Sequence, residues 1–331
     1  LARVEIAEAA AAFDAAIELD QGDPLPRLGL GLATIRDGQL DEGTRHIETA
    51  ASLDPGNSLV RSYLGKAYFE QKRSKLDDRE LGLAKQLDPN DPTPWFYSAI
   101  TRQTGNQPVE ALRDMEEAIA LNDNRAVYRS RLLLDSDLAA RSASLGRIYG
   151  DLGFQSLALV EGWNSVNADP TNSSAHRLLA DSYAVLPRHE IARVSELYQS
   201  QMLQPINTTA IQPRLGEGSL ALVSGQGPSA LSFNEFNPLF NRDQFQAQLS
   251  GMYAEDATWL GEAIVSGIAG KFSFSAGYNR YETDGWRENS DMDDEVANLF
   301  MQLELSPKTS IQGEYRYRSG ERRDIRLRFF A

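Results

Sequence analysis

The sequence predicts an α + β multidomain chain in which a solenoid of helical hairpins precedes an antiparallel β-sheet. A Leu-Asp or Leu-Asn pair recurs every 34 residues in the first half, at Leu19-Asp20, Leu53-Asp54, Leu87-Asp88 and Leu121-Asn122. A period of this length is typical of stacked helical hairpins. Later in the chain apolar and polar residues alternate, which predicts strands. We expect the solenoid over residues 1–204, a linker or plug over 205–243 and about six strands over 244–331.

Charge and composition exclude several functional classes. The 331 residues carry a formal net charge of −14, whereas binding to a phosphate backbone needs clustered Lys and Arg, so we expect no nucleic-acid partner. The chain has no Cys, which excludes disulfides, zinc-thiolate sites and thiol catalysis. It has no run of about 18 apolar residues, so a transmembrane helix is not expected, although a transmembrane strand would leave no such run.

The first module divides into units that start after the recurring pairs, at residues 24–57, 58–91, 92–125 and 173 to about 204. Small residues recur at fixed phases, as Leu-Gly at 30–31, 64–65 and 145–146 and as Ala at 50, 84 and 118. Such residues let antiparallel helices approach closely. The pattern resembles the tetratricopeptide repeat (TPR), including Trp95 at the aromatic position of the first helix and Pro55, Pro89 and Pro170 at the repeat end.

The units depart from this repeat in three places. Asp77 stands where the repeat family prefers Ala, and we expect both Asp77-Asp78 and Asp293-Asp294 to be solvated surface pairs. An insertion near 126–138 is expected to form a loop or short extension near the concave face, with a lengthened helix as the alternative. Residues 9–16 fit the second helix of a repeat whose first helix is missing, so we expect the natural protein to extend toward its N-terminus.

A stack of hairpins predicts a concave groove that binds a protein or peptide, as an extended segment or a partner helix. We expect the groove residues on the first helix of each unit. Four side chains at the fourth position of their units are the candidates: Arg27, Arg61, Trp95 and His176. The alternative is structural, with Trp95 packed between repeats and the Arg side chains solvated.

The second module has candidate strands at 244–253, about 260–269, 271–280, 297–305, 311–318 and 325–330. In the third, Phe272 and Phe274 share one face while Ser273 and Ser275 share the other. Several strands reach about nine to eleven residues, and short turns alternate with a long acidic loop at 283–294, as is typical of outer-membrane barrels. The alternative is a soluble sheet with one buried face. Six strands cannot close a barrel, so we expect an incomplete one.

The linker is rich in Gly, Pro, Asn and Ser, which marks loops. Its Gly-rich pieces lack the Lys-Ser/Thr ending of a phosphate loop and the strand–helix setting of a dinucleotide site. We expect its apolar residues to hold it against the sheet or to lie inside a barrel as a plug: Phe233, Phe236, Leu239 and Phe240. In a barrel, Arg316 and Arg318 would form part of a charged inner wall.

No pattern predicts catalysis, a cofactor or a metal site. The three His residues lie far apart and in no metal-binding spacing: His46, His176 and His189. No Ser stands in a nucleophile elbow. The four Asp of the acidic loop lack the regular ligand spacing of a calcium loop, so they would bind calcium only weakly. We therefore expect a protein that is not an enzyme.

A repeat solenoid followed by barrel strands resembles the export porins of bacterial exopolysaccharide systems. The resemblance implies a non-enzymatic outer-membrane protein whose periplasmic repeats form a scaffold for protein–protein interaction, with polysaccharide as cargo. The alternative is a soluble adaptor, periplasmic or cytoplasmic. Its groove would bind a peptide or partner helix, and its β domain would pack on the end of the solenoid.

Overall fold

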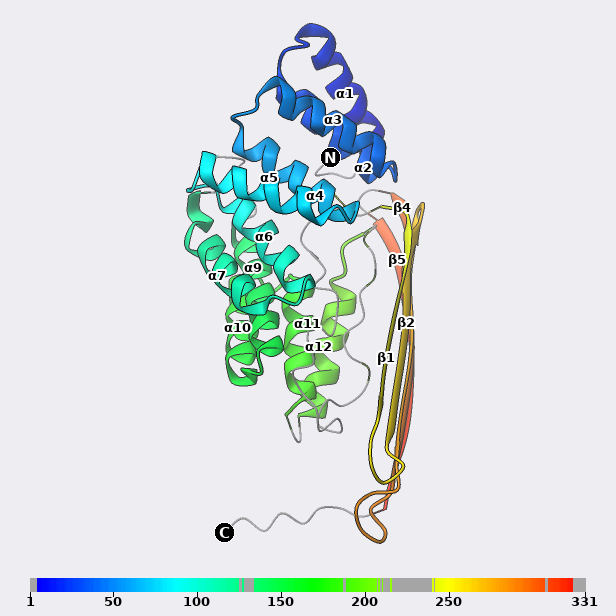
Figure 1. Ribbon diagram of the computed structural model, residues 1–331. Coiled ribbons are helices and arrows are strands. Elements are labelled where there is room, and N and C mark those ends of the chain that lie inside the picture. Colours follow the sequence, from blue (N-terminus) through cyan, green and yellow to red (C-terminus); the bar gives the residue numbers. More distant parts are fainter. Residues whose placement is uncertain are drawn as a thin grey trace.

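The computed structural model describes residues 5–124, 127, 134–186, 189–206, 208, 210, 215, 240, 242–306 and 309–323. Within these residues lie eleven α-helices, one 3-10 helix and five strands. Both the predicted helical hairpins and the predicted antiparallel sheet are therefore present. The helices stack into a solenoid, and the sheet runs along one side of it (Figure 1).

The helices form antiparallel pairs, α2 with α3, α4 with α5, α6 with α7, α9 with α10 and α11 with α12, and α1 packs on α2. Their bounds are α1 Ile6–Leu19, α2 Pro24–Arg36, α3 Leu40–Leu53, α4 Ser58–Glu70, α5 Ser74–Leu87, α6 Pro92–Thr104, α7 Pro108–Ala120, the 3-10 helix η1 Asn122–Asn124, α9 Leu134–Asp151, α10 Gln155–Ala168, α11 Ser173–Ala184 and α12 Glu190–Met202. In Figure 1, α4 and α6 lie toward the sheet, and α5 and α7 lie away from it.

A second set of Asp and Asn residues, distinct from those of the Leu-Asp and Leu-Asn pairs, explains where four of the first helices begin. Asp23, Asn57, Asp91 and Asn172 each precede a first helix, and each side chain accepts a hydrogen bond from a backbone N–H in the first turn. Such caps satisfy N–H groups that have no partner within the helix. These N-cap residues therefore fix where the first helix of each of these pairs begins.

The small residues set how closely the paired helices approach. A Cβ at Gly31 of α2 would lie 2.7 Å from the Gly43 carbonyl oxygen of α3, and one at Gly65 of α4 would lie 2.7 Å from Leu81 Cγ of α5. Neither distance is compatible with a side chain at the present spacing. Between the pairs, apolar side chains such as Ile47 and Met115 are fully buried, so the solenoid has a continuous core.

One expectation for the helical module is wrong, and another is only partly covered by the described residues. The described part of the insertion is helical, since α9 begins at Leu134 and is 18 residues long. This favours the lengthened helix over the loop for residues 134–138, while most of 126–133 lies outside the described residues. Asp77 is not a solvated residue, because its side chain is fully buried beneath α4 and α6, whereas Asp78 is exposed. Its place in the repeat, normally filled by Ala, explains the burial.

The five strands form one open sheet in sequence order, with every neighbouring pair antiparallel. They are β1 Gln244–Tyr253, β2 Trp259–Ala269, β3 Phe272–Thr283, β4 Met292–Ser306 and β5 Thr309–Arg322. The predicted sixth strand lies outside the described residues. The long loop is shorter than expected because β4 starts at Met292. Asp294 is consequently a buried strand residue that binds Arg318, so its predicted surface position is wrong.

The sheet has an exposed face that is mainly apolar and a covered face that is mainly polar, which we call the polar face, although Ile264, Ile268, Val296 and Phe300 are also buried on it. Along β4 the buried positions include Asn298, Gln302 and Glu304, whereas Leu303 and Leu305 between and beyond them are exposed. The adjacent strand β3 follows the same rule. The predicted alternation is confirmed. The polar face buries some apolar side chains, as the covered face of a soluble sheet does, but the opposite face leaves many large apolar side chains exposed.

Both ends of helix α12 contact the polar face. Gln312 Nε2 donates a hydrogen bond to the carbonyl oxygen of Met202, at the C-terminal end of α12 (3.2 Å). Arg318, expected in a lumen wall, binds Glu190 of α12 as well as Asp294 of its own sheet. Helix-end carbonyls and charged groups find partners on this face, so the sheet lies along the solenoid and not on its end.

The linker also reaches the solenoid. Phe240, expected against the sheet or in a plug, packs on Tyr63 of α4. The other three apolar residues named in the linker, Phe233, Phe236 and Leu239, lie outside the described residues.

Candidate partner-binding surface of the solenoid

The first helices of successive pairs present polar and charged residues toward the sheet, and we call this side the inner surface. It carries Lys66 and Glu70 on α4, Gln103 on α6, Arg147 and Asp151 on α9 and Asp181 on α11. The sheet lies on the same side as α4 and α6 (Figure 1). The inner surface is therefore the concave face on which a repeat solenoid would receive a partner.

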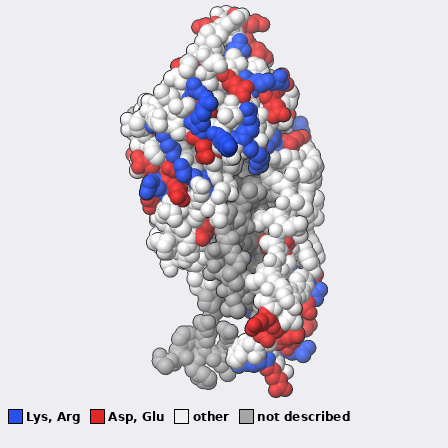
Figure 2. Space-filling model, viewed as in Figure 1, with Lys and Arg blue, Asp and Glu red and all other residues white. Residues whose placement is uncertain are grey.

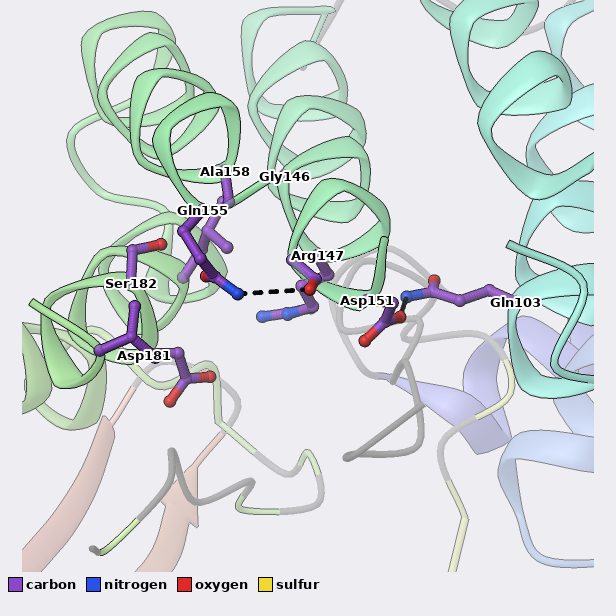
Figure 3. A pocket seen from close by; sticks show the side chains of 11 residues that line it. Gln103, Gly146, Arg147, Asp151, Gln155, Ala158, Asp181 and Ser182 are labelled. Atoms are coloured by element: carbon purple, nitrogen blue, oxygen red, sulfur yellow. Dashed lines mark hydrogen bonds between the residues drawn. The ribbon is translucent and has the colours of Figure 1, made fainter. Parts of the chain in front are cut away.

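A pocket opens on the inner surface where four helices meet (Figure 3). Its lining comes from α6, α9, α10 and α11: Gln103, Gly146, Arg147, Gly150, Asp151, Gln155, Ala158, Leu178, Asp181, Ser182 and Val185. A Cβ added at Gly150 would meet no heavy atom within 4 Å, so this glycine keeps the space open. A Cβ at Gly146 would lie 2.4 Å from Leu178 Cδ2, so that glycine serves helix packing.

Hydrogen bonds orient the polar groups of the pocket. Gln103 Nε2 donates to Asp151 Oδ2 across the gap between α6 and α9 (2.8 Å). Gln155 Nε2 donates to the Gly150 carbonyl oxygen (3.4 Å). In Figure 3 the Arg147 side chain lies beside the bond from Gln155. The pocket is thus lined by a cation, two carboxylates and two amides, groups that donate and accept hydrogen bonds, and Asp181 also lies 3.8 Å from Arg177 Nε.

The four residues predicted from the sequence lie elsewhere on the first helices, and three of them share one arrangement. Arg61 Nε donates to the Pro55 carbonyl oxygen (3.1 Å), and Trp95 Nε1 donates to that of Pro89 (3.2 Å). His176 Nε2 lies 2.9 Å from the carbonyl oxygen of the corresponding Pro170. Each side chain therefore ties its helix to the turn that precedes the unit.

The same three side chains also reach a second helix. Arg61 pairs with Glu80 of α5, and His176 Nδ1 lies 2.6 Å from Glu196 of α12. The Lys85 ammonium of α5 lies over the Trp95 ring, 4.3 Å from the ring centroid. Arg27 differs, because Gln21 stands where the others have Pro, and its half-buried side chain has no partner at Nε. None of the four lines the pocket, and their part in binding a partner stays a prediction.

Sequence reasoning missed the pocket residues, although a signal for them exists. Lys66, Arg147 and Asp181 each directly follow the small residue that packs the first helix, namely Gly65, Gly146 and Ala180. A charged residue at this position faces away from the paired helix, because the small residue faces toward it. A search for charge after the small position would have found three inner-surface residues.

The described residues hold no group of three His, Asp or Glu side chains arranged to bind a metal ion. In the acidic loop region the carboxylates pair with arginines instead, Asp293 with Arg280 and Asp291 with Arg323. Among the helices that the structure describes, none has both the length and the apolar character needed to cross a membrane.

No protein-family model and no curated protein matches the chain. Among solved structures, a chain in the crystal structure of the APC/C hetero-tetramer Cut9-Hcn1 is 20% identical with a TM-score of 0.53, over 60% of this chain and 37% of that chain. YrrB, a TPR protein with an unusual peptide-binding site, is 19% identical with a TM-score of 0.40, over 59% and 94%.

PilW, a type IV pilus biogenesis factor, is 17% identical with a TM-score of 0.47, over 54% of this chain and 77% of that one. This chain spans little more than a third of the Cut9-Hcn1 chain that it matches. The likeness to that chain shows fold alone. Joined to the 34-residue period and the paired helices, it shows that the helical module has the fold of a TPR-type solenoid.

Proposed function

We propose that this chain is a non-enzymatic scaffold for protein–protein interaction whose inner surface binds a peptide segment of a partner. The observation that supports this function is the pocket, where polar and charged side chains from four helices converge. Arg147 supplies donors and Asp181 supplies acceptors. A peptide carries both kinds of group along its backbone, so this combination suits a peptide better than a ligand of a single charge.

A selection from a random peptide library displayed on phage, against the immobilised full chain, tests this function. We expect peptides whose affinity falls about tenfold or more in the Arg147→Glu and Asp181→Arg variants. Arg113→Glu is the matched control, because Arg113 is exposed on α7, the second helix of its pair. Selected peptides that bind the natural chain and both pocket variants equally would contradict the proposal.

A second candidate is an outer-membrane protein with the solenoid in the periplasm and polysaccharide as export cargo. One observation favours it, the exposed apolar face of the sheet. Phe245, Leu249 and Ile311 on that face are 71%, 79% and 62% exposed. Figure 2 shows uncharged residues over most of the sheet side, with charged residues gathered at its lower end. A contiguous apolar surface of this kind marks contact with a membrane or another protein.

Fractionation of bacterial cells that express the full-length protein tests the second candidate. We expect recovery in the outer-membrane fraction and extraction only with detergent, because the apolar face would contact hydrocarbon. Recovery in the soluble fraction without detergent would remove the outer-membrane function and leave the scaffold function intact.

A further inference from the structure

The solenoid already binds one segment of its own chain on the inner surface. Phe240 is only 4% exposed. Its ring stacks on that of Tyr63 in α4, with centroids 6.4 Å apart and planes 16° from parallel. The Lys66 ammonium lies 5.5 Å from the centre of the same ring, and Tyr63 is held from its other side by an edge contact with Tyr97 of α6. Stacking and cation–π contacts are both favourable in a desolvated site.

Arg242, two residues farther along, makes the second contact. Its Nη1 lies 2.9 Å from Glu70 Oε2 in α4, while Lys66 binds the other carboxylate oxygen at 2.6 Å. Burial by itself would raise the pKa of Glu70, but Lys66 and Arg242 together lower it to about 2. The carboxylate therefore stays charged near neutral pH and attracts a cation.

Tyr63, Lys66 and Glu70 form one continuous site because they lie three and four residues apart on a single face of α4. Lys66 occupies the same position in its unit as Arg147 and Asp181 of the pocket occupy in theirs. The segment thus fills on α4 the kind of surface that later units offer at the pocket. It is a ligand that the chain supplies to itself.

We propose that Tyr63, Lys66 and Glu70 are a recognition site for peptides with an aromatic residue two positions before an Arg, and that Phe240 and Arg242 occupy this site until such a peptide displaces them. The inference rests on the proposed scaffold function, since it gives the chemistry of a partner segment for the same inner surface. The site selects the aromatic residue by stacking and the Arg by its charge-assisted bond to Glu70.

Displacement requires a competitor that overcomes a tethered ligand. A segment that belongs to the same chain binds at a higher effective concentration than a free peptide does. A free peptide with the same two contacts therefore competes poorly with the natural chain. It binds well once Phe240 and Arg242 are removed, and this difference makes the inference measurable.

Fluorescence anisotropy with a fluorescein-labelled peptide of the sequence of residues 236–244 tests the inference on the full chain. We expect the peptide to bind the double variant Phe240→Ala/Arg242→Ala at least about tenfold more tightly than the natural chain. A peptide with Ala in place of the Phe and Arg equivalent to residues 240 and 242 should lose that affinity by a similar factor. Arg113→Ala in the double variant, on the outer side of the solenoid, should change nothing.

Exchanging the charges of Glu70 and of the peptide Arg is a stricter test than removing them. Glu70→Lys in the double variant should weaken the peptide at least about tenfold, and a peptide with Glu at its Arg position should recover binding to that variant. Equal binding to the natural chain and the double variant, or no recovery in the exchange, overturns the inference. Should circular dichroism show that the double variant is unfolded, the single variant Arg242→Glu takes its place, because repulsion from Glu70 should open the site with Phe240 retained.

The two proposals fail separately. A phage selection without pocket-dependent peptides, alongside the expected anisotropy result, removes the pocket as the partner site and keeps the self-bound segment. If the phage selection yields pocket-dependent peptides but the anisotropy experiment fails, the scaffold function stands and the proposed recognition of an aromatic residue and an Arg does not.

Discussion

At the scale of the residue, Asp77 is the position where this solenoid departs furthest from what its packing favours. Burial raises the pKa of its carboxyl group to about 7, against smaller opposing effects of Thr101 and Lys66. The residue fills a place that a small apolar side chain would fill without desolvation cost. Its protonation is consequently linked to folding near neutral pH.

We expect Asp77 to make the protein less stable as pH rises from about 4 to about 7. In that range the folded state holds a proton that the unfolded state has released, since the unfolded pKa is near 3.8. The loss should be about 2 to 4 kcal/mol. Urea unfolding at pH 5 and pH 8 should show it for the natural chain and show much less for Asp77→Asn. Parallel pH profiles for the two chains would contradict this expectation.

Trp95 gives a second prediction at this scale, because two substitutions remove different sets of its contacts. Trp95→Phe removes only the bond to the Pro89 carbonyl and should cost about 0.5 to 1 kcal/mol. Trp95→Ala also removes the contact with Lys85 and should cost about 2 kcal/mol. Urea unfolding followed by circular dichroism measures both. Equal stability of all three chains would show that the side chain does not tie the turn to the helix.

At the scale of the element, the sequence predicted what depends on local spacing. Helix starts, small-residue phases and strand faces all depend on residues close together in the chain, and each follows a short period. The pocket was missed because its lining combines α6, α9, α10 and α11, so no single unit contains it. The insertion before α9 was left open between a loop and a lengthened helix, because it has no counterpart in the other units to compare with.

The paired helices offer a prediction with an internal control. Gly65→Ala should destabilise the α4–α5 pair by about 1 to 3 kcal/mol, because the new Cβ would press on Leu81. Gly82→Ala, in the middle of α5, should stabilise by about 0.5 to 1 kcal/mol, because open space surrounds it. Thermal unfolding of the two variants measures both signs. If Gly82→Ala also destabilised the protein, the expectation that helix propensity decides the effect at that position would be wrong.

At the scale of the whole molecule, alternation predicted which side chains share a face but not what covers each face. The polar face of the sheet meets the solenoid through Gln312 and Arg318, partners that lie more than 100 residues away in the chain. Contacts of that kind leave no local period in a sequence. The order of the strands was predictable because each turn joins neighbours, whereas the pairing of sheet with helices was not.

The apolar face allows a prediction about the whole molecule in contact with lipid. Leu303 and Ile311 are cross-strand partners on this face, both exposed, so changing both to Lys should alter the stability in water by less than about 1 kcal/mol. It should nevertheless weaken association with vesicles of bacterial phospholipid severalfold, since each Lys would enter an apolar phase. Vesicle flotation measures the association, with Arg113→Lys as control. Unchanged flotation would count against membrane contact by this face.

Two contacts join the solenoid to opposite edges of the sheet: Glu70 of α4 binds Arg242, just before β1, and the Met202 carbonyl oxygen of α12 accepts a hydrogen bond from Gln312 of β5. Solenoids flex easily, since each repeat contacts only its neighbours, whereas the ladder of paired strands from β1 to β5 fixes the distance between the two edges of the sheet. We expect the sheet to restrain the curvature of the solenoid between α4 and α12. A partner of the proposed inner surface that needs a wider or tighter arc would then have to break one of these two contacts.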